Sequence, residues 1–152
     1  MIGAIDLGGT KVALGVADAA GRLQATSRFA TRPERGPEAV VAEMVAGLRA
    51  LGGPIDRVGL ASVGPLDLAT GTIMRPPNFP GWEAVPIRAM LEAALGCPVT
   101  VDNDANAAAL AEYRFGAGQG AECLVYATVS TGIGGGIVLG GRVRHGLGGG
   151  AG

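Results

Sequence analysis

The sequence contains few cysteines, no long apolar run and no excess of basic charge. Its two cysteines, Cys97 and Cys123, are too few and too far apart in the sequence for a disulfide framework or a zinc site. No apolar run reaches the roughly 18 residues of a membrane-spanning helix, and the N-terminal residues lack the cationic segment of a signal peptide. Twelve Lys and Arg against thirteen Asp and Glu exclude the basic excess typical of nucleic-acid binding. We therefore expect a soluble, cytosolic chain with no membrane or nucleic-acid partner.

Glycine is the residue present in excess. It makes up 28 of the 152 residues, against a typical share of about 7%. The glycines follow no Gly-X-Y period and form no Gly/Ser tract, which excludes collagen and a flexible linker. The composition, 48% hydrophobic and 16% charged, excludes disorder. The glycines of a folded chain of this kind need a structural or functional explanation.

Hydrophobic periodicity and turn residues predict an α/β layer. Three strands in succession are expected first, forming an antiparallel meander, and helices and strands alternate after them. A loop of about twenty residues, 64–85, is rich in proline and glycine, and a loop of that length favours a functional role. The expected strands are 2–6, 11–16, 23–30, 57–63, 99–101, 123–129 and 136–139, and the expected helices are 37–51, 86–95 and 105–115.

The stretch Asp6-Leu7-Gly8-Gly9-Thr10-Lys11 suits a phosphate-binding hairpin. Glycines let backbone N–H groups converge on phosphate oxygens, Thr10 adds a hydroxyl donor, and Lys11, the only lysine of the chain, adds a positive charge. Asp6 ends a strand, where its carboxylate suits a magnesium ion. An ordinary hairpin turn is the alternative, because a Gly-Gly pair also suits a plain turn through the positive φ that glycine adopts.

The triplet Asp102-Asn103-Asp104 lies where a strand meets a helix. Asn and Asp are preferred N-caps, so one of the three is expected to cap the helix. Side chains at the carboxyl end of a strand in an α/β sheet also face the crevice where ligands bind. An aspartate there can accept the proton of a substrate hydroxyl during phosphoryl transfer. Capping alone and catalysis are both consistent with the triplet.

Three further features carry weaker indications. The stretch 130–136, Ser-Thr-Gly-Ile-Gly-Gly-Gly, is a second candidate phosphate loop with the same chemistry. Asn78, close to Trp82, offers polar and aromatic surface to a sugar, and the alternative is that Trp82 anchors the loop on the core. Cys97 and Cys123 are expected to be small buried apolar residues.

Taken in order, these motifs resemble the ROK family of sugar kinases and repressors, within the actin-like ATPase superfamily. The resemblance implies an actin-like ATPase (ribonuclease H-like) lobe, a mixed sheet flanked by helices, over residues 1–118, and the first hairpin of a second lobe over 119–152. The segments that carry it are Asp6–Lys11, Gly64-Pro65, Pro77-Asn78, Gly81-Trp82, 102–109, 112–118 and 130–136.

The resemblance also implies an activity, the ATP-dependent phosphorylation of a hexose hydroxyl by a glucokinase that uses ATP and Mg²⁺. In this family the counterpart of Asp104 is the catalytic base, and the counterparts of Asn78, Asn103, Gly64 and Pro65 contact the sugar. The phosphate contacts correspond to Asp6, Gly8, Gly9, Thr10 and Lys11 in the first loop and to Thr131 and Gly132 in the second.

Members of the family are normally longer than this chain. Their Glu-x-Gly-His sugar contact, cysteine-rich Zn²⁺ site and adenine pocket are expected beyond Gly152, so we expect the 152-residue chain to be inactive alone. A homo-oligomer is a further hypothesis, because a terminal hairpin leaves unpaired strand edges. The alternatives are a non-enzymatic sugar-binding protein and a ROK-type transcriptional regulator lacking its DNA-binding segment.

Overall fold

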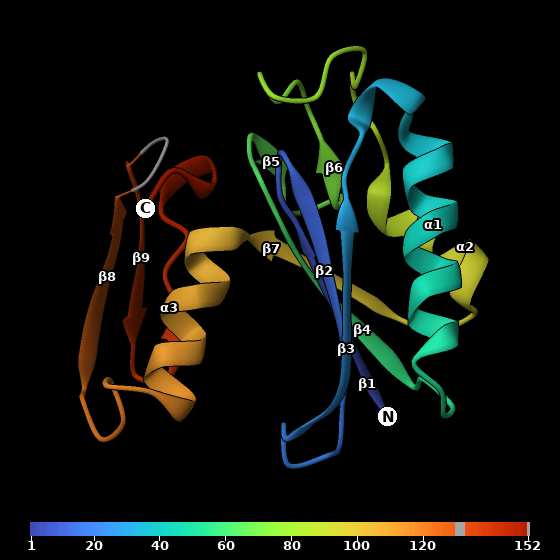
Figure 1. Cartoon of the computed structure of the whole chain (residues 1–152). Helices are drawn as coiled ribbons and strands as arrows, with labels where there is room; N and C mark the ends of the chain where they lie inside the picture. Colours follow the sequence, from blue (N-terminus) through green and yellow to red (C-terminus); the bar gives the residue numbers. More distant parts are fainter. Residues whose placement is uncertain (130–132, 152) are drawn as a thin grey trace. The chain divides into compact units, whose positions relative to one another are not determined.

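The computed structural model describes residues 1–129 and 133–151. The chain divides into two compact units, Met1–Asp102 and Asn103–Gly152. Each unit contains its own sheet and its own helical cover (Figure 1). The domain boundary expected after residue 118 stays a prediction.

The first unit is built on a five-stranded mixed sheet. Its order is β3-β2-β1-β4-β7, and the strands are β1 (Ile2–Leu7), β2 (Lys11–Ala17), β3 (Leu23–Ala30), β4 (Arg57–Ser62) and β7 (Val99–Asn103). The first three strands pair antiparallel in succession, which confirms the predicted meander. β1 and β4 pair parallel, with Asp6 opposite Ala61 and Leu7 opposite Ser62. The carboxyl ends of β1 and β4 therefore lie side by side.

Two helices, α1 (Pro37–Ala50) and α2 (Ile87–Leu95), cover one face of this sheet (Figure 1). The alternating side chains of the strands supply Ile5 and Leu7 to the core on that face, and α1 supplies Met44 and Leu48. Gly47 lets α1 approach β2 closely, since a Cβ there would lie 2.4 Å from a methyl carbon of Leu14. The other face of β1 carries the exposed Ala4 and Asp6.

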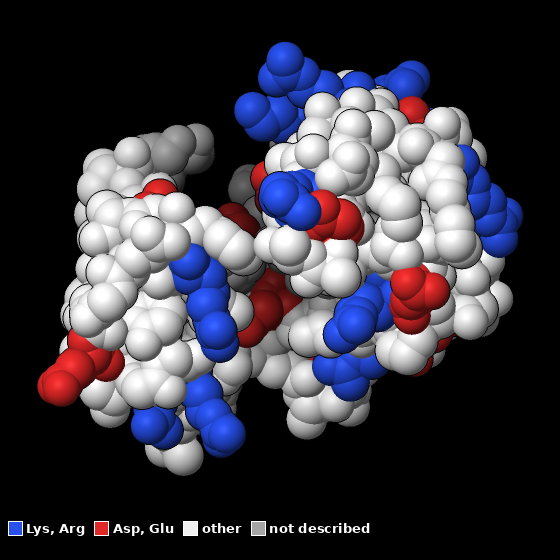
Figure 2. Space-filling model, turned by 90° about the horizontal axis from the view of Figure 1, so that it is seen from below, with Lys and Arg blue, Asp and Glu red and all other residues white. Residues whose placement is uncertain are grey.

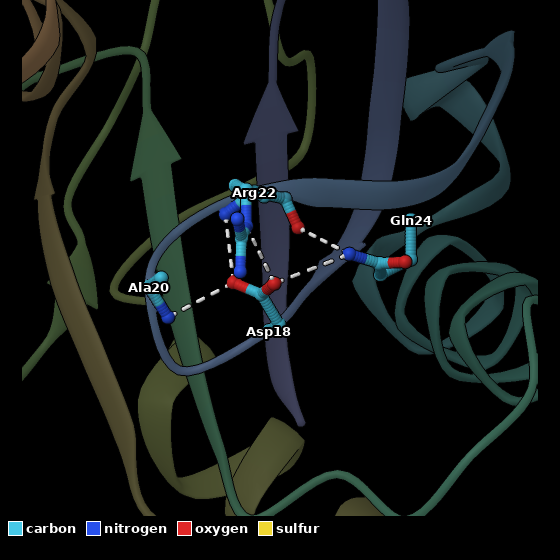
Figure 3. A network of polar contacts seen from close by, with 4 residues as sticks. All are labelled: Asp18, Ala20, Arg22 and Gln24. Atoms are coloured by element: carbon cyan, nitrogen blue, oxygen red, sulfur yellow. Dashed lines mark hydrogen bonds and ion pairs between the residues drawn. The ribbon is translucent and has the colours of Figure 1, made fainter.

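The turn between β2 and β3 is closed by Asp18 (Figure 3). Its carboxylate accepts hydrogen bonds from the backbone N–H groups of Ala20 at 2.9 Å and Arg22 at 3.0 Å, and from the Arg22 side chain at 3.0 Å. Donation from the Arg22 backbone, then from its side chain, lowers the pKa of Asp18 below its ordinary value. The ionised carboxylate therefore stabilises the turn.

The long loop predicted over 64–85 contains a small hairpin that we did not predict. Its strands are β5 (Leu66–Asp67) and β6 (Thr72–Ile73), which pair antiparallel. Arg88 of α2 holds the connecting turn by donating to the carbonyls of Leu68 at 2.8 Å and Ala69 at 2.9 Å. Two-residue strands carry too little hydrophobic alternation to be recognised in a sequence.

The second unit packs α3 (Asp104–Phe115) on a three-stranded antiparallel sheet of order β10-β9-β8. Its strands are β8 (Cys123–Val129), β9 (Ile133–Leu139) and β10 (Arg142–Val143), and short 3-10 turns occur at η1 (Pro33–Arg35) in the first unit and η2 (Leu147–Gly149) in the second.

Gly136 lies directly beneath α3, since a Cβ there would lie 2.7 Å from the Cβ of Ala109 and 2.9 Å from the Ala105 carbonyl oxygen. β9 starts at residue 133, earlier than the predicted 136, and its Gly134 and Gly136 face α3.

The outer face of the β8–β9 hairpin is apolar and exposed. Val125, Val129 and Ile133 are 73%, 79% and 85% exposed, on the face opposite α3. Cys123 is exposed on the same face and Cys97 is half-buried, so the prediction of two buried cysteines is wrong. The error came from composition alone, which does not indicate which face of β8 the helix covers.

Charged side chains of both signs are spread across the face of the molecule in Figure 2. Among the described residues, no helix is long and apolar enough to cross a membrane.

Candidate functional site

The first candidate phosphate loop is the tight turn between β1 and β2. The Gly8 N–H donates to the Lys11 carbonyl at 3.0 Å, and Asp6, Thr10 and Lys11 are exposed. Neither Gly8 nor Gly9 has a φ in the left-handed region, so the positive φ that we expected of a Gly-Gly hairpin turn is wrong. The turn needs glycine for close approach, because a Cβ on Gly8 would lie 3.0 Å from the Lys11 carbonyl oxygen.

Gly9 brings this turn against the long loop at Asn78. A Cβ on Gly9 would lie 3.3 Å from the Cβ and 3.4 Å from the Nδ2 of Asn78. The exposed Asn78 side chain therefore lies directly against the glycine turn. The structure places a candidate sugar contact next to a candidate phosphate contact, although 69 positions separate the two residues in the sequence (78 − 9).

Two aromatic residues hold the Asn78 loop on the core. Phe79 and Trp82 are each 1% exposed, with ring centroids 4.7 Å apart in an edge-to-face arrangement. The Trp82 indole N–H donates to the Pro33 carbonyl at 3.0 Å. Trp82 is therefore the loop anchor that sequence analysis gave as one alternative, and its ring is not surface offered to a sugar.

Gly64 and Pro65 follow the carboxyl end of β4, beside the end of β1. The Val63 N–H donates to the Leu7 carbonyl at 3.3 Å, and the Gly64-Pro65 peptide bond is cis. The Pro65 carbonyl accepts from the Met74 N–H at 3.0 Å, which ties this turn to the end of β6. Ligands of α/β sheets bind at such strand ends, and the turn shares this edge of the sheet with Asp6.

The hairpin after Pro65 is stabilised by Asp67. Its carboxylate accepts from the Thr70 hydroxyl at 2.8 Å and from the Ala69 N–H at 3.0 Å. Donation from the Thr70 hydroxyl is the main cause that lowers the pKa of Asp67. Asp67 is therefore a structural residue of this loop.

Asn103 caps α3, as expected of one member of the triplet. Its side-chain oxygen accepts from the N–H groups of Ala105 at 2.9 Å and Asn106 at 3.4 Å. Asp104 is the first residue of the helix and is exposed, and its Oδ1 also accepts from the Ala105 N–H, at 2.8 Å. The cap fixes Asp104 in the first turn of α3, with its carboxylate on the surface of the second unit.

Sequence reasoning missed Thr31, which lies just after β3. Thr31 is fully buried, its hydroxyl donates to the Gly8 carbonyl at 2.7 Å, and its N–H donates to the Thr10 carbonyl at 3.1 Å. No motif marks Thr31, because the 23 positions between it and Gly8 are bridged only by strand pairing. The sequence offered one indication of this role: Thr31 is a polar residue directly after β3, the strand that pairs with β2 at the end of the turn.

Two predicted site residues, Thr131 and Gly132, lie outside the described residues. Within 1–129 and 133–151, no three His, Cys, Asp or Glu side chains gather into a group that could hold a metal ion.

The ROK family matches residues 2–152. A glucokinase of Streptomyces coelicolor is 41% identical over 145 residues, which cover 93% of this chain and 44% of that protein. The chain therefore spans about half the length of the curated relatives that it matches.

Two solved structures agree with this family. The ROK hexokinase of Thermus thermophilus is 48% identical with a TM-score of 0.86, over 96% of this chain and 49% of that one. The ROK family glucokinase of Streptomyces griseus, in complex with glucose and AMPPNP, is 42% identical with a TM-score of 0.82, over 93% of this chain and 45% of that one. The mixed sheet of this chain, flanked by helices, is that of the actin-like ATPase fold, and the chain belongs to the ROK family.

Proposed function

We propose that the whole protein is an ATP-dependent sugar kinase that transfers the γ-phosphoryl group of ATP to a hydroxyl of a hexose, with glucose as its substrate. The contact between Gly9 and Asn78 carries this proposal. Phosphoryl transfer requires the donor phosphate and the acceptor hydroxyl to be held in contact. A loop suited to phosphate and a side chain suited to a sugar hydroxyl meet at this contact.

The similarity to glucokinases supports glucose as the hexose. Over the aligned residues, the relative that was solved with glucose and AMPPNP is 42% identical to this chain, and the curated glucokinase is 41% identical. In our proposal Asn78 and Asn103 bond sugar hydroxyls, and the turn at Gly64-Pro65 lines the same edge of the sheet. The side-chain oxygen of Asn103 serves as the helix cap.

Asp104 is the proposed general base. Its exposed carboxylate is fixed by the first turn of α3, and a carboxylate accepts a proton from the attacking hydroxyl. The hexose oxygen forms a bond to the γ-phosphorus, the bond from that phosphorus to the β,γ-bridging oxygen breaks, and the hydroxyl proton passes to Asp104. The products are a hexose phosphate and ADP. This chemistry needs little beyond positioning and charge stabilisation from the protein.

The turn of residues 8–11 and its neighbour Asp6 would hold the phosphates and their Mg²⁺ ion. Thr10 and Lys11 are exposed, and they offer a hydroxyl and an ammonium group to phosphate oxygens. The exposed Asp6 carboxylate fits Mg²⁺, which is usually bound by one or two carboxylates together with substrate phosphates. When bound, the ion neutralises charge on the phosphates. A cytoplasmic location stays a prediction of the sequence.

The proposal is tested with the purified whole protein, ATP, Mg²⁺ and glucose, by coupling ADP formation to a spectrophotometric signal. We expect ADP formation that depends on glucose. Replacing Asn78 by alanine should raise the KM for glucose by about tenfold, the effect of losing a hydrogen bond worth about 1.4 kcal/mol. Replacing Gln24, an exposed amide near the start of β3, by alanine should leave the KM for glucose unchanged. Binding of glucose without any phosphoryl transfer contradicts the kinase and favours a non-enzymatic sugar-binding protein.

A further inference from the structure

The fully buried Thr31 holds the glycine turn at two points. Its hydroxyl donates to the Gly8 carbonyl at 2.7 Å and its backbone N–H donates to the Thr10 carbonyl at 3.1 Å. A threonine with no exposed surface has no direct access to a substrate, so any effect of Thr31 on the reaction acts through these two carbonyls.

Fixing a carbonyl also fixes the next amide. In a planar trans peptide the C=O and the following N–H point in opposite directions. With the carbonyls of Gly8 and Thr10 both directed at Thr31, the N–H groups of Gly9 and Lys11 point away from Thr31. Backbone N–H groups presented together in a turn bind anions.

The same short segment also supports the Asn78 loop. Pro33, two residues after Thr31, accepts the indole N–H of Trp82 through its carbonyl, and Trp82 anchors the loop that places Asn78 against Gly9. The backbone of residues 31–33 therefore connects to both candidate binding elements. The hydroxyl of Thr31, however, donates its hydrogen bond to the glycine turn, at the Gly8 carbonyl.

We infer that Thr31 is a positioning residue for phosphate binding. Its hydroxyl holds the Gly8–Gly9 peptide in the orientation that presents the Gly9 N–H, together with that of Lys11, to the phosphates of ATP. This inference rests on the proposed function of the turn. It predicts that the Thr31 hydroxyl matters more for binding of the nucleotide than for binding of the sugar.

Three variants of the whole protein test the inference. Thr31→Val keeps the shape and removes the hydroxyl, Thr31→Ser keeps the hydroxyl, and Thr26→Val makes the same chemical change at an exposed position of β3. We expect Thr31→Val to raise the KM for ATP about tenfold and to leave the KM for glucose within twofold. Thr31→Ser should return the KM for ATP to within twofold of the wild-type value, and Thr26→Val should have no effect.

A nuclear magnetic resonance titration of the wild-type protein with AMPPNP keeps the inference testable if Thr31→Val does not fold. The amide resonances of Gly9 and Lys11 should move on nucleotide addition. That of Gly8, whose N–H donates to the Lys11 carbonyl, should move least.

Each contrary result has its own meaning. Equal rises in both KM values, or a Thr31→Ser variant as impaired as Thr31→Val, overturn the positioning role and leave the kinase standing. An amide resonance of Gly8 that shifts more than the resonance of Gly9 also overturns the positioning role and leaves the kinase standing. A wild-type protein that neither turns over nor binds AMPPNP overturns the proposed function, and the positioning role with it.

Discussion

Replacing Gly136 by alanine should loosen the contact between α3 and β9. The added Cβ would lie 2.7 Å from the Cβ of Ala109, which is 0.7 Å short of the 3.4 Å at which ordinary contact begins (3.4 − 2.7). It would also lie 2.9 Å from the Ala105 carbonyl oxygen, a backbone atom that no rotamer change moves. Helix and strand must therefore separate, and α3 begins with Asp104.

The expected cost combines two opposing effects. Overpacking of this kind destabilises the folded protein by about 1–3 kcal/mol. The change from glycine to alanine also lowers the entropy of the unfolded chain, which stabilises the folded protein by about 0.4–1 kcal/mol. We expect Gly136→Ala to lower the free energy of unfolding by about 1–2 kcal/mol. Gly59→Ala is the matched control, because a Cβ at this glycine of β4 would meet nothing within 4 Å. It should be neutral or stabilising by about 0.4–1 kcal/mol.

Urea denaturation followed by far-ultraviolet circular dichroism measures both free energies. Hydrogen exchange localises the effect, and the amides of α3 and β9 should exchange about five- to thirtyfold faster in Gly136→Ala. The single tryptophan, Trp82, reports on the first unit by fluorescence. A Gly136→Ala variant as stable as the wild type would show that α3 does not press on this strand. A Gly59→Ala variant destabilised to the same extent would show that the loss is not caused by the contact.

Two other predictions concern the first unit. Trp82→Phe removes the indole donor from the Pro33 carbonyl, which still accepts from the Gly36 N–H at 3.0 Å. The free energy of unfolding in urea should therefore fall by about 0.5–1.5 kcal/mol, the net contribution of one hydrogen bond; an unchanged value would contradict the anchoring role. Asp18 has a pKa that hydrogen bonds lower in the folded state, so its stabilisation is present at neutral pH and is lost as the pH falls below about 4. The stability difference between wild type and Asp18→Asn should therefore shrink in acid, and a difference that grows in acid would refute this reasoning.

Much of the architecture follows from local sequence patterns. The strands of the β1–β2–β3 meander alternate apolar and polar residues or form buried runs, and α1 carries Val41, Met44, Val45 and Leu48 at helical spacing. These patterns are local, so a single sequence reveals them. The start of β9 at residue 133 was mistaken for loop, because Gly134 to Gly136 lack the side chains that would show alternation.

The candidate site was predicted as separate motifs, and their relation came only from the structure. Nothing in the sequence indicates that Asn78 lies against Gly9, since the contact depends on how Phe79 and Trp82 pack. Thr31 likewise acquires its role from strand pairing. The N-cap of α3 is local, and the sequence correctly predicted that one member of the triplet would be the cap.

The proposed role of Asp104 as the general base of a sugar kinase is tested by one comparison of variants. In the whole protein, Asp104→Asn should lower kcat by at least about a hundredfold, the lower range for loss of a general base, while the dissociation constant for glucose, measured by calorimetry, changes by less than about threefold, under 1 kcal/mol. Asp18→Asn removes one carboxylate from the β2–β3 turn and should leave both values unchanged. A kcat of Asp104→Asn within tenfold of the wild type, at unchanged glucose affinity, would contradict the account.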